Sequence, residues 1–412
     1  MTISQREPIT GARSSRQLTE SILQTQPSSG QHMNSIDSTA LCVKTTLRVV
    51  EVDIRNDSRW EKFVSGHPSG SIYHHPTWLE ALKREYGREG LYLACEDDAG
   101  QFLAVLPLSY TRGLPFKLGG GLTGRRLSSL PRTPIAGPLS KDSRATAAIV
   151  KATIQFVAQD HTAQVQIKTQ GRELDGLVDG LVCTPWRLSY VLRLDNYSNG
   201  PFRVADSDNR HSIKKAVNRA IRLGVRIRPA ETLSDLREWY VLYLDTMRRN
   251  CVPARPFRFF SALWELLRPK GLMKLLLAER QDDRRKRLIA GTIFLQFAQT
   301  TTCGFNGSSP ADFSLRPNDL IYWEAINEAC RRRYRFFDFG EVAEEHPELA
   351  RYKSKWGSEP VRLYRYYFPA PHDGNARTFD SGGYPGMLLR EIWRRLPLRA
   401  TACLSDRIYS YL

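Results

Sequence analysis

The sequence predicts a mixed α/β (α+β) protein that contains two similar units in tandem. The chain has 412 residues and 41% hydrophobic content, which is more than one ordinary core accommodates. A helical pattern followed by two strand patterns with a charged turn between them occurs twice. Strand and helix patterns then alternate through the C-terminal half, as expected for mixed, twisted sheets flanked by helices.

The first unit follows a polar leader. Residues 1–45 are rich in Ser, Thr and Gln without apolar periodicity, and we expect them to be disordered. The alternating pattern TLRVVEV at 46–52 predicts the first strand. A helical pattern at 76–87 precedes LYLACEDDAGQFLAVLPLSY at 91–110, which predicts a strand, an acidic turn and a second strand. We place this unit at 46–205.

The second unit repeats that order of patterns. A helical pattern at 257–271 precedes strand, charged turn and strand at 272–297. We place this unit at 206–369, and a linker with a tail at 370–412. The tail contains LLREIWRRLPLRA at 388–400, a basic amphipathic helix. Because its apolar strip is short, packing on the domain is favoured over contact with a membrane surface.

A one-sided basic helix opens the second unit. The apolar positions around Ile213 and Val217 fall on one helical face, and Gly224 suits a left-handed stop. No acid occurs between Arg210 and Arg228, whereas solvated helices usually mix charge signs. The pattern fits an ordinary solvated face or an anion-binding face, and for the second case the candidate residues are Arg210, Lys214, Lys215, Arg219 and Arg222.

The net charge of +17 indicates anionic partners, such as nucleic acid, a nucleotide cofactor, a phosphorylated precursor or lipid head groups. Seven cysteines without a C-x-x-C spacing argue against a disulfide framework and a structural zinc site. There is no signal pattern, and the longest apolar run is too short to span a bilayer. We therefore expect a cytoplasmic protein, able to touch the inner face of the membrane.

Several familiar motifs are excluded by their context. GGGLTG at 119–124 is followed by prolines that prevent the helix of a dinucleotide site. DFG at 338–340 lacks the other kinase motifs. His74 and His75 have no partners at metal-ligand spacing, so turn or core positions are favoured for them. No nucleophile elbow and no metal motif occur.

The segment DFGEVAEEHPELARYKSKWG at 338–357 follows a buried-looking strand. The strand brings Asp338 and Glu341 to the end of the sheet, where ligands of open α/β sheets gather. If the following piece is extended, Lys353 and Lys355 lie on one side, and their repulsion favours an anion between them. A solvated loop fits the same residues equally well.

The residues FFDFGEV…LARYKSKWG resemble the C-terminal signature of the FemAB-type branch of the GCN5-related N-acetyltransferase (GNAT) superfamily. This branch includes peptidoglycan aminoacyltransferases and CelD-like acetyltransferases of polysaccharide gene clusters. IYHHPTWLEAL, the basic helix at 212–223 and GFNGSS…LRPNDLIYWEAINEAC agree with it. The resemblance implies two tandem GNAT-like units and direct acyl transfer to an amine, without a covalent enzyme intermediate, which would explain why no nucleophile motif is found.

The resemblance also implies roles for individual residues. Tyr352 and Lys353 match the family's aromatic-Lys element, and Lys353 would contact a phosphate or the developing oxyanion. Asp338 and Glu341 would orient or deprotonate the acceptor amine. The further residues expected to bind substrate or donor are Asn306, Asn318, Lys355 and Trp356.

The resemblance implies an acyl donor and leaves its identity open. The usual coenzyme A loop is replaced here by SSPADFSLRPN, so acyl-CoA and aminoacyl-tRNA both remain possible donors, although the amides near Asn318 could still hold a phosphate. Acceptors would be nucleotide- or lipid-linked glycan precursors, with neither metal nor DNA involved. A non-catalytic module that binds an anionic polymer is the alternative from a different functional class.

Overall fold

The computed structural model describes residues 46–87, 90–112, 125–159, 164–194, 207–282, 285–370 and 384–409. These residues fall within one compact unit, Thr45–Leu412. The expected leader at 1–45, the GGGLTG segment and most of the linker before the tail lie outside the described residues.

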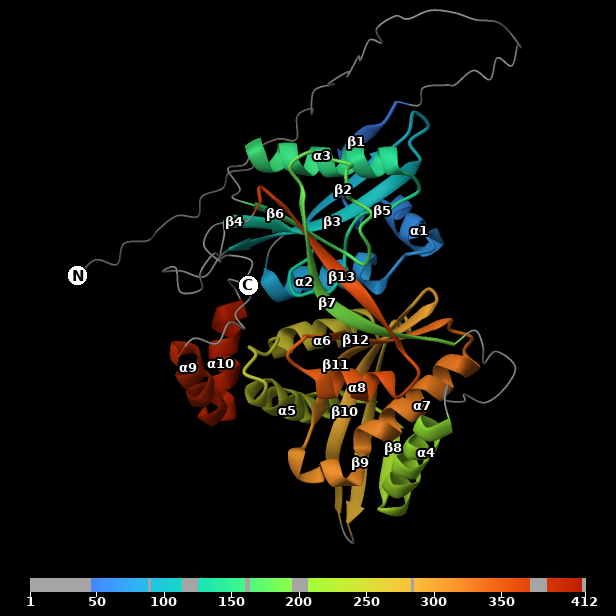
Figure 1. Ribbon diagram of the computed structural model, residues 1–412, viewed down its shortest axis with the longest axis vertical. Helices are drawn as coiled ribbons and strands as arrows, with labels where there is room; N and C mark the ends of the chain where they lie inside the picture. Colours follow the sequence, from blue (N-terminus) through green and yellow to red (C-terminus); the bar gives the residue numbers. More distant parts are fainter. Residues whose placement is uncertain are drawn as a thin grey trace, which may run out of the picture. The chain divides into compact units, whose positions relative to one another are not determined.

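Two halves of this unit share one order of elements (Figure 1). The first half consists of β1 (Arg48–Glu51), α1 (Ser58–Gly66), α2 (Pro76–Tyr86), β2 (Gly90–Glu96), β3 (Phe102–Arg112), β4 (Arg125–Ser128), α3 (Ser143–Gln159), β6 (Gln164–Thr169) and β7 (Val182–Arg193). The second consists of β8 (Val225–Pro229), α5 (Leu233–Arg249), α6 (Phe257–Leu266), β9 (Met273–Asp282), β10 (Arg285–Phe297), β11 (Thr300–Ser308), α7 (Pro317–Arg331), β12 (Phe336–Val342) and β13 (Glu359–Phe368). The predicted repeat and the mixed α/β fold class are confirmed.

The remaining elements have no counterpart in the other half. They are the two-residue β5 (Leu139–Ser140) beside β3, the basic helix α4 (Ser207–Arg222), α8 (Pro347–Ser354), the tail helices α9 (Tyr384–Arg395) and α10 (Leu398–Tyr409), and short 3-10 turns such as Ile72–His74 and Pro310–Leu315. The expected tail helix is therefore two helices. The break falls at Pro397, which has no N–H to donate and disfavours helical geometry in the residue before it.

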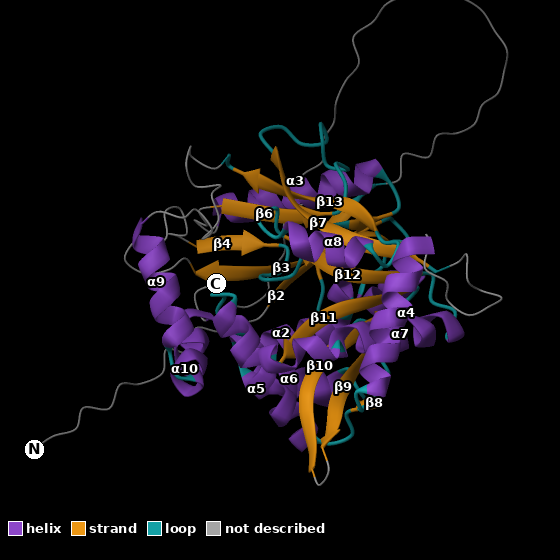
Figure 2. Ribbon diagram, turned by 60° about the horizontal axis from the view of Figure 1, so that its bottom comes forward, coloured by secondary structure: helices purple, strands orange, loops and turns teal. Residues whose placement is uncertain are grey.

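The last strand of each half crosses into the other half. The strand order is β1-β2-β3-β4-β6-β13-β7-β12-β11-β10-β9-β8 (Figure 2). β13 pairs antiparallel with β6 of the first half, and β7 pairs antiparallel with β12 of the second. Each half also contains one parallel pair, β4 with β6 and β11 with β12, and each pair is joined through a helix. The exchange makes the two halves one continuous sheet.

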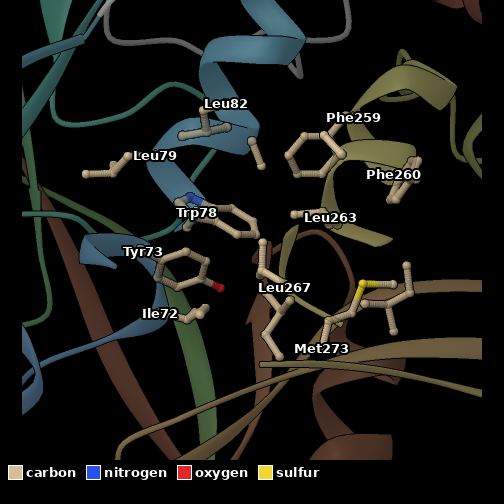
Figure 3. Close-up of a cluster of buried hydrophobic side chains, with 14 of the residues drawn as sticks. Ile72, Tyr73, Trp78, Leu79, Leu82, Phe259, Phe260, Leu263, Leu267 and Met273 are labelled. Atoms are coloured by element: carbon tan, nitrogen blue, oxygen red, sulfur yellow. The ribbon is translucent and has the colours of Figure 1, made fainter. Parts of the chain in front are cut away.

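Side-chain alternation along the strands produces three cores. Leu276 and Ala278 of β9 face a core with α4 and α7, whereas Leu275 and Leu277 face the opposite way. A matching core lies under α3 in the first half. The third core joins both halves, because α2 packs against α6. Figure 3 shows its centre, where Tyr73, Trp78 and Leu82 meet Phe259, Leu263 and Leu267.

His74 and His75 are structural, as predicted. His75 begins α2, where its Nδ1 accepts from the amide of Thr77 at 3.1 Å. The Nε2–H of His74 donates to the carbonyl oxygen of Gly137 at 2.9 Å, and its Nδ1 accepts from the Ser71 hydroxyl at 2.8 Å. Burial lowers the pKa of His74 to about 4, so the ring is neutral near pH 7 and this arrangement follows.

We expect acid to destabilise the protein through His74. Its pKa is about 4 in the folded state and 6.5 ordinarily, so between these values the unfolded chain binds a proton that the folded chain does not. The free energy of unfolding should therefore fall by up to about 3 kcal/mol as the pH drops through this window. Urea unfolding at several pH values checks this against His74→Gln, whose pH dependence should be flatter. Parallel curves for the two proteins would contradict it.

The tail helices pack against the domain, as the short apolar strip indicates. Ser405 and Thr401 are buried, and the Ser405 hydroxyl accepts from the amide of Ala254 at 3.0 Å. The guanidinium of Arg248 donates to the carbonyl oxygen of Leu396 at 3.0 Å. Among the described residues, no helix has the length and apolar content that crossing a membrane requires.

Candidate active site

A fork opens between the parallel strands β11 and β12 of the second half. Their pairing ends at Thr302 and Asp338, although both strands continue further. Next to this point, β12 carries one extra residue relative to its other neighbour β7, and β11 carries one extra residue relative to its other neighbour β10. On β12 the register with β7 shifts between Asp338 and Glu341, and on β11 the register with β10 shifts at Gly304. Such bulges bend strands, and here they free backbone groups beside a row of polar side chains.

Gly340 occupies the bulge of β12. Its φ of +78° lies in the left-handed region that favours glycine. A Cβ atom built there would lie 3.4 Å from the carbonyl oxygen of Cys303 and 4.0 Å from Nζ of Lys353. Both distances are ordinary van der Waals contacts, so the positive φ, and not a lack of space, favours glycine at this position.

We expect Gly340→Ala to damage the fork more than the fold. The left-handed conformation costs a non-glycine residue about 1–2 kcal/mol, and relaxing that strain would move the carbonyl groups that hold Lys353. Turnover should fall by at least about tenfold, which corresponds to about 1.4 kcal/mol, while circular dichroism stays unchanged. Gly271→Ala is the matched control, since Gly271 also has positive φ, +69°, but has open space around its Cβ position. Equal turnover of both variants would contradict the prediction.

Lys353 projects from α8 into the fork. Its side chain is 6% exposed, and its ammonium group donates to the carbonyl oxygens of Gly340 at 2.9 Å and Glu341 at 3.2 Å. An ammonium group carries three donors, and the described residues offer no third acceptor. Burial lowers the pKa of Lys353, which the charge of Asp338 partly offsets. One N–H of a desolvated cation thus remains for a ligand.

Asp338 lies beside this cation with one carboxylate oxygen fixed and the other available. Its Oδ1 accepts from the Ser189 hydroxyl at 2.7 Å and from the amide of Gly340 at 2.8 Å. Its Oδ2 has no donor within the described residues. Desolvation raises the pKa of Asp338, against the effect of these two hydrogen bonds. A carboxylate held this way is oriented for accepting a proton.

Glu341 and Tyr73 complete the surroundings of Asp338. Glu341 Oε1 accepts from Arg187 of β7 at 2.8 Å. Tyr73 comes from the first half, next to α2, and is 8% exposed. Burial raises the pKa of its phenol, and the charges of Asp338 and Glu341 raise it further, so the three side chains lie within electrostatic reach of one another. The fork therefore combines residues from both halves.

Three other predicted residues lie close to Lys353 in sequence but have different surroundings. The extended geometry considered for 352–356 is wrong, since α8 includes Tyr352 and Lys353 and ends at Ser354. Lys355 donates to Oδ1 of Asp319 at 2.5 Å and lies over the Tyr352 ring at 4.1 Å. No anion is therefore needed to separate Lys355 from Lys353. Trp356 is fully buried in the core under α7.

Asn306 and Asn318 lie together at the start of α7. The amide of Asn306 donates to the Thr292 hydroxyl at 2.8 Å and to Oδ1 of Asn318 at 3.2 Å. This link ties β10, β11 and α7 to one another. Asp319, in the first turn of α7, supplies a negative charge of its own at the end of the helix where a phosphate would bind.

The basic helix α4 packs on α7 and β8 rather than on α8. Ile213 and Val217 are buried, as predicted, while Lys214, Lys215 and Arg222 are exposed. Arg219 donates to the carbonyl oxygen of Ser314 at 3.1 Å, and Arg210, near the start of α4, is partly buried. Within the described residues, no hydrogen bond or ion pair joins this cationic face to Lys353, whose ammonium group binds the carbonyl oxygens of Gly340 and Glu341. A shared role for the two groups stays a prediction.

The sequence reasoning passed over the residues that the first half contributes. Tyr73 precedes the two histidines considered above, and Arg187 and Ser189 lie in a strand that has no charged motif. Only the exchange of strands brings Arg187 and Ser189 beside β12. One local signal could have indicated Tyr73. In IYHHPTW, its aromatic hydroxyl stands shortly before the start of a helix.

Comparisons with known proteins agree with this architecture. Residues 207–354 match the family described as "Acetyltransferase (GNAT) domain". The solved structure of FemX is similar with a TM-score of 0.58 at 13% identity, covering 78% of this chain and 98% of FemX. L-PGS from Bacillus licheniformis is similar with a TM-score of 0.50 at 12% identity, covering 83% of this chain and 98% of that one. No curated protein matches the sequence. At these identities the structural similarities show the fold.

Proposed function

We propose that this chain is an acyltransferase of the FemAB-like branch of the GNAT superfamily, and that it transfers an acyl group to an amine of a cell-envelope or exopolysaccharide precursor. The reaction is direct attack of the amine on a donor thioester or ester, with no covalent enzyme intermediate. The observation that carries the proposal is the fork. It pairs the buried ammonium of Lys353, with one N–H unused, and the oriented carboxylate of Asp338.

In the proposed reaction the acceptor nitrogen attacks the donor carbonyl carbon. A C–N bond forms, and the carbonyl electrons move to oxygen, where the free N–H of Lys353 stabilises the oxyanion. Asp338 accepts the proton that the nitrogen loses. When the oxyanion collapses, the C–S or C–O bond breaks and the leaving thiolate or alkoxide takes up a proton. Glu341 with Arg187, and Tyr73, orient the acceptor beside Asp338.

The proposed donors are tested by mass spectrometry with the full chain. Acetyl-CoA and a charged tRNA are each incubated with amino-sugar and peptide amines, and products are detected by their mass shift. Amine-dependent loss of the acyl group from one donor is expected. The proposal fails if neither donor loses its acyl group to any amine above the rate without enzyme, while the protein remains folded.

The exposed cations of α4 favour aminoacyl-tRNA as a second candidate donor. Lys214, Lys215 and Arg222 form a basic surface that a polyanion can follow, and the coenzyme A loop is absent. tRNA binding through several phosphates should weaken steeply with salt. Lys214→Glu combined with Lys215→Glu should then weaken tRNA binding by at least about tenfold. If tRNA binding does not depend on salt and the double variant retains it, the cations of α4 do not recognise tRNA. Aminoacyl-tRNA then loses its support, and acyl-CoA becomes the favoured donor.

A peripheral membrane contact through the tail is proposed as part of this cytoplasmic function. Ile392 and Leu404 are 50% and 38% exposed on the tail helices, and Arg394 is exposed nearby. Apolar side chains next to cations suit an anionic lipid surface. Sedimentation with phosphatidylglycerol vesicles should recover the protein, and Ile392→Glu with Leu404→Glu should abolish recovery. If this variant sediments with the vesicles as fully as the wild type, the tail does not contact the membrane.

A further inference from the structure

A buried lysine and a half-buried arginine lie side by side on the face of the sheet that carries Asp338. Lys168 of β6 is the register partner of Arg365 of β13, and opposed residues of an antiparallel pair project to the same side. Their neighbours Ile167 and Tyr366 face the core under α3, so Lys168 and Arg365 face the other way. Burial lowers the pKa of both groups, and the charge of Arg365 lowers that of Lys168 further.

These cations adjoin the fork through Glu341. The charge of Glu341 acts on the pKa of Lys168 and on that of Arg365, in each case favouring the protonated form. Glu341 itself is bound to Arg187 at 2.8 Å. Arg187 therefore binds Glu341 directly, and Lys168 and Arg365 lie within electrostatic reach of the same carboxylate.

The cationic group contains more positive charge than its carboxylate balances. Lys168 is 3% exposed, and its Nζ donates to the carbonyl oxygen of Leu130 at 2.5 Å. Arg365 stacks on the Trp186 ring at 3.5 Å, and no acceptor for its buried Nε lies within the part of the chain that the structure describes. Arg255, which also acts on Lys168, has its own partner in Glu85. Buried cations in excess of their acids are costly unless a ligand supplies the missing negative charge.

We propose that Lys168 and Arg365, with Arg187, bind an oxyanion of the acceptor substrate, a phosphate or a carboxylate adjacent to the reacting amine. The inference rests on the proposed function, because it describes the acceptor of the same fork. Arg365 supplies a planar set of donors, and Lys168 supplies a point charge beside it. An acceptor anchored in this way presents its amine to Asp338.

Binding of small anions to the full chain tests the site without turnover. Inorganic pyrophosphate and succinate represent the two oxyanion chemistries, and calorimetric titration compares wild type with Lys168→Met, Arg365→Gln and the control Lys151→Met on the exposed side of α3. At least one probe should bind wild type and the control with a dissociation constant below about 1 mM. Each site variant should weaken it at least about tenfold, and the probe that binds identifies the chemistry.

Two results would overturn the inference. One is binding of neither probe below about 10 mM, and the other is equal affinity in wild type and in a site variant that remains folded. The unfolding temperature measured without anion shows whether each variant is folded. If Arg365→Gln does not fold, Arg365→Lys replaces it in the comparison of affinities. The titration contains no acyl donor, so its result does not depend on acyl transfer. If the protein proved not to transfer acyl groups, anion binding would still stand, and if the anions did not bind, the proposed acyl transfer would still stand.

Discussion

Asp338→Asn is expected to lower kcat/KM about 10²- to 10⁴-fold, the range that a positioned general base contributes. Asparagine keeps the size of the side chain and can still accept hydrogen bonds from Ser189 and the Gly340 amide through its oxygen. What it loses is the ability to take the proton from the acceptor nitrogen. Steady-state turnover measures the effect, with whichever donor the mass-spectrometric assay identifies.

The pH dependence separates this role from a structural one. Desolvation raises the pKa of Asp338, so the wild-type rate should rise with pH through a value above the ordinary 3.8, where the carboxylate ionises. It should fall again below pH 10.5, because burial lowers the pKa at which Lys353 loses its charge. Asp338→Asn should remove the acidic limb and keep the alkaline one. An unchanged acidic limb in that variant would show that another group accepts the proton.

Arg255→Met is expected to destabilise the protein by about 3–5 kcal/mol, the cost of leaving a buried charge without its partner. Arg255 and Glu85 are almost fully buried and bound at 2.6 Å, and they join the second half to α2 of the first. Burial raises the pKa of Glu85 to about 7, and Arg255 opposes that rise. Without the guanidinium, Glu85 must bind a proton to stay buried. Urea unfolding at about pH 8, where ionisation of the carboxyl is most costly, measures the loss.

A double variant isolates the charge from the lost packing. Glu85→Gln with Arg255→Met removes both charges, so it should recover much of the stability that Arg255→Met loses. The loss in Arg255→Met should also shrink at about pH 5, where protonation of Glu85 costs the folded state little. If the single and double variants unfold alike at both pH values, the cost comes from packing on Phe259 instead.

Much of the second half could be predicted from the sequence because its patterns are local. The apolar positions of 318–333 and the alternation of FFDFG reflect the periods of a helix and a strand, and α7 and β12 follow them closely. The candidate residues Asp338, Glu341 and Lys353 lie within one short segment. The roles proposed for them and the unit boundary at residue 205 remain proposals.

The rest of the site depends on long-range pairing that no local pattern reveals. Ser189 and Arg187 meet β12 only because β7 crosses from the first half, about 150 residues away in sequence. α8 was expected as a charged loop, since a helix of eight residues has too few apolar positions for its period to be recognised. Its formation turns Lys353 into the fork and Lys355 toward Asp319.

Turnover of Lys353→Met against Lys355→Met tests the central claim most directly, because the two lysines lie two residues apart and differ in where their ammonium groups bind. Donor-dependent acylation is followed by mass spectrometry with wild type and both variants at equal concentration. The fork predicts that Lys353→Met loses at least about 10²-fold in kcat, as removal of an oxyanion donor does, while Lys355→Met stays within about tenfold of wild type. Full turnover by a folded Lys353→Met protein would contradict an acyl-transfer centre between β11 and β12.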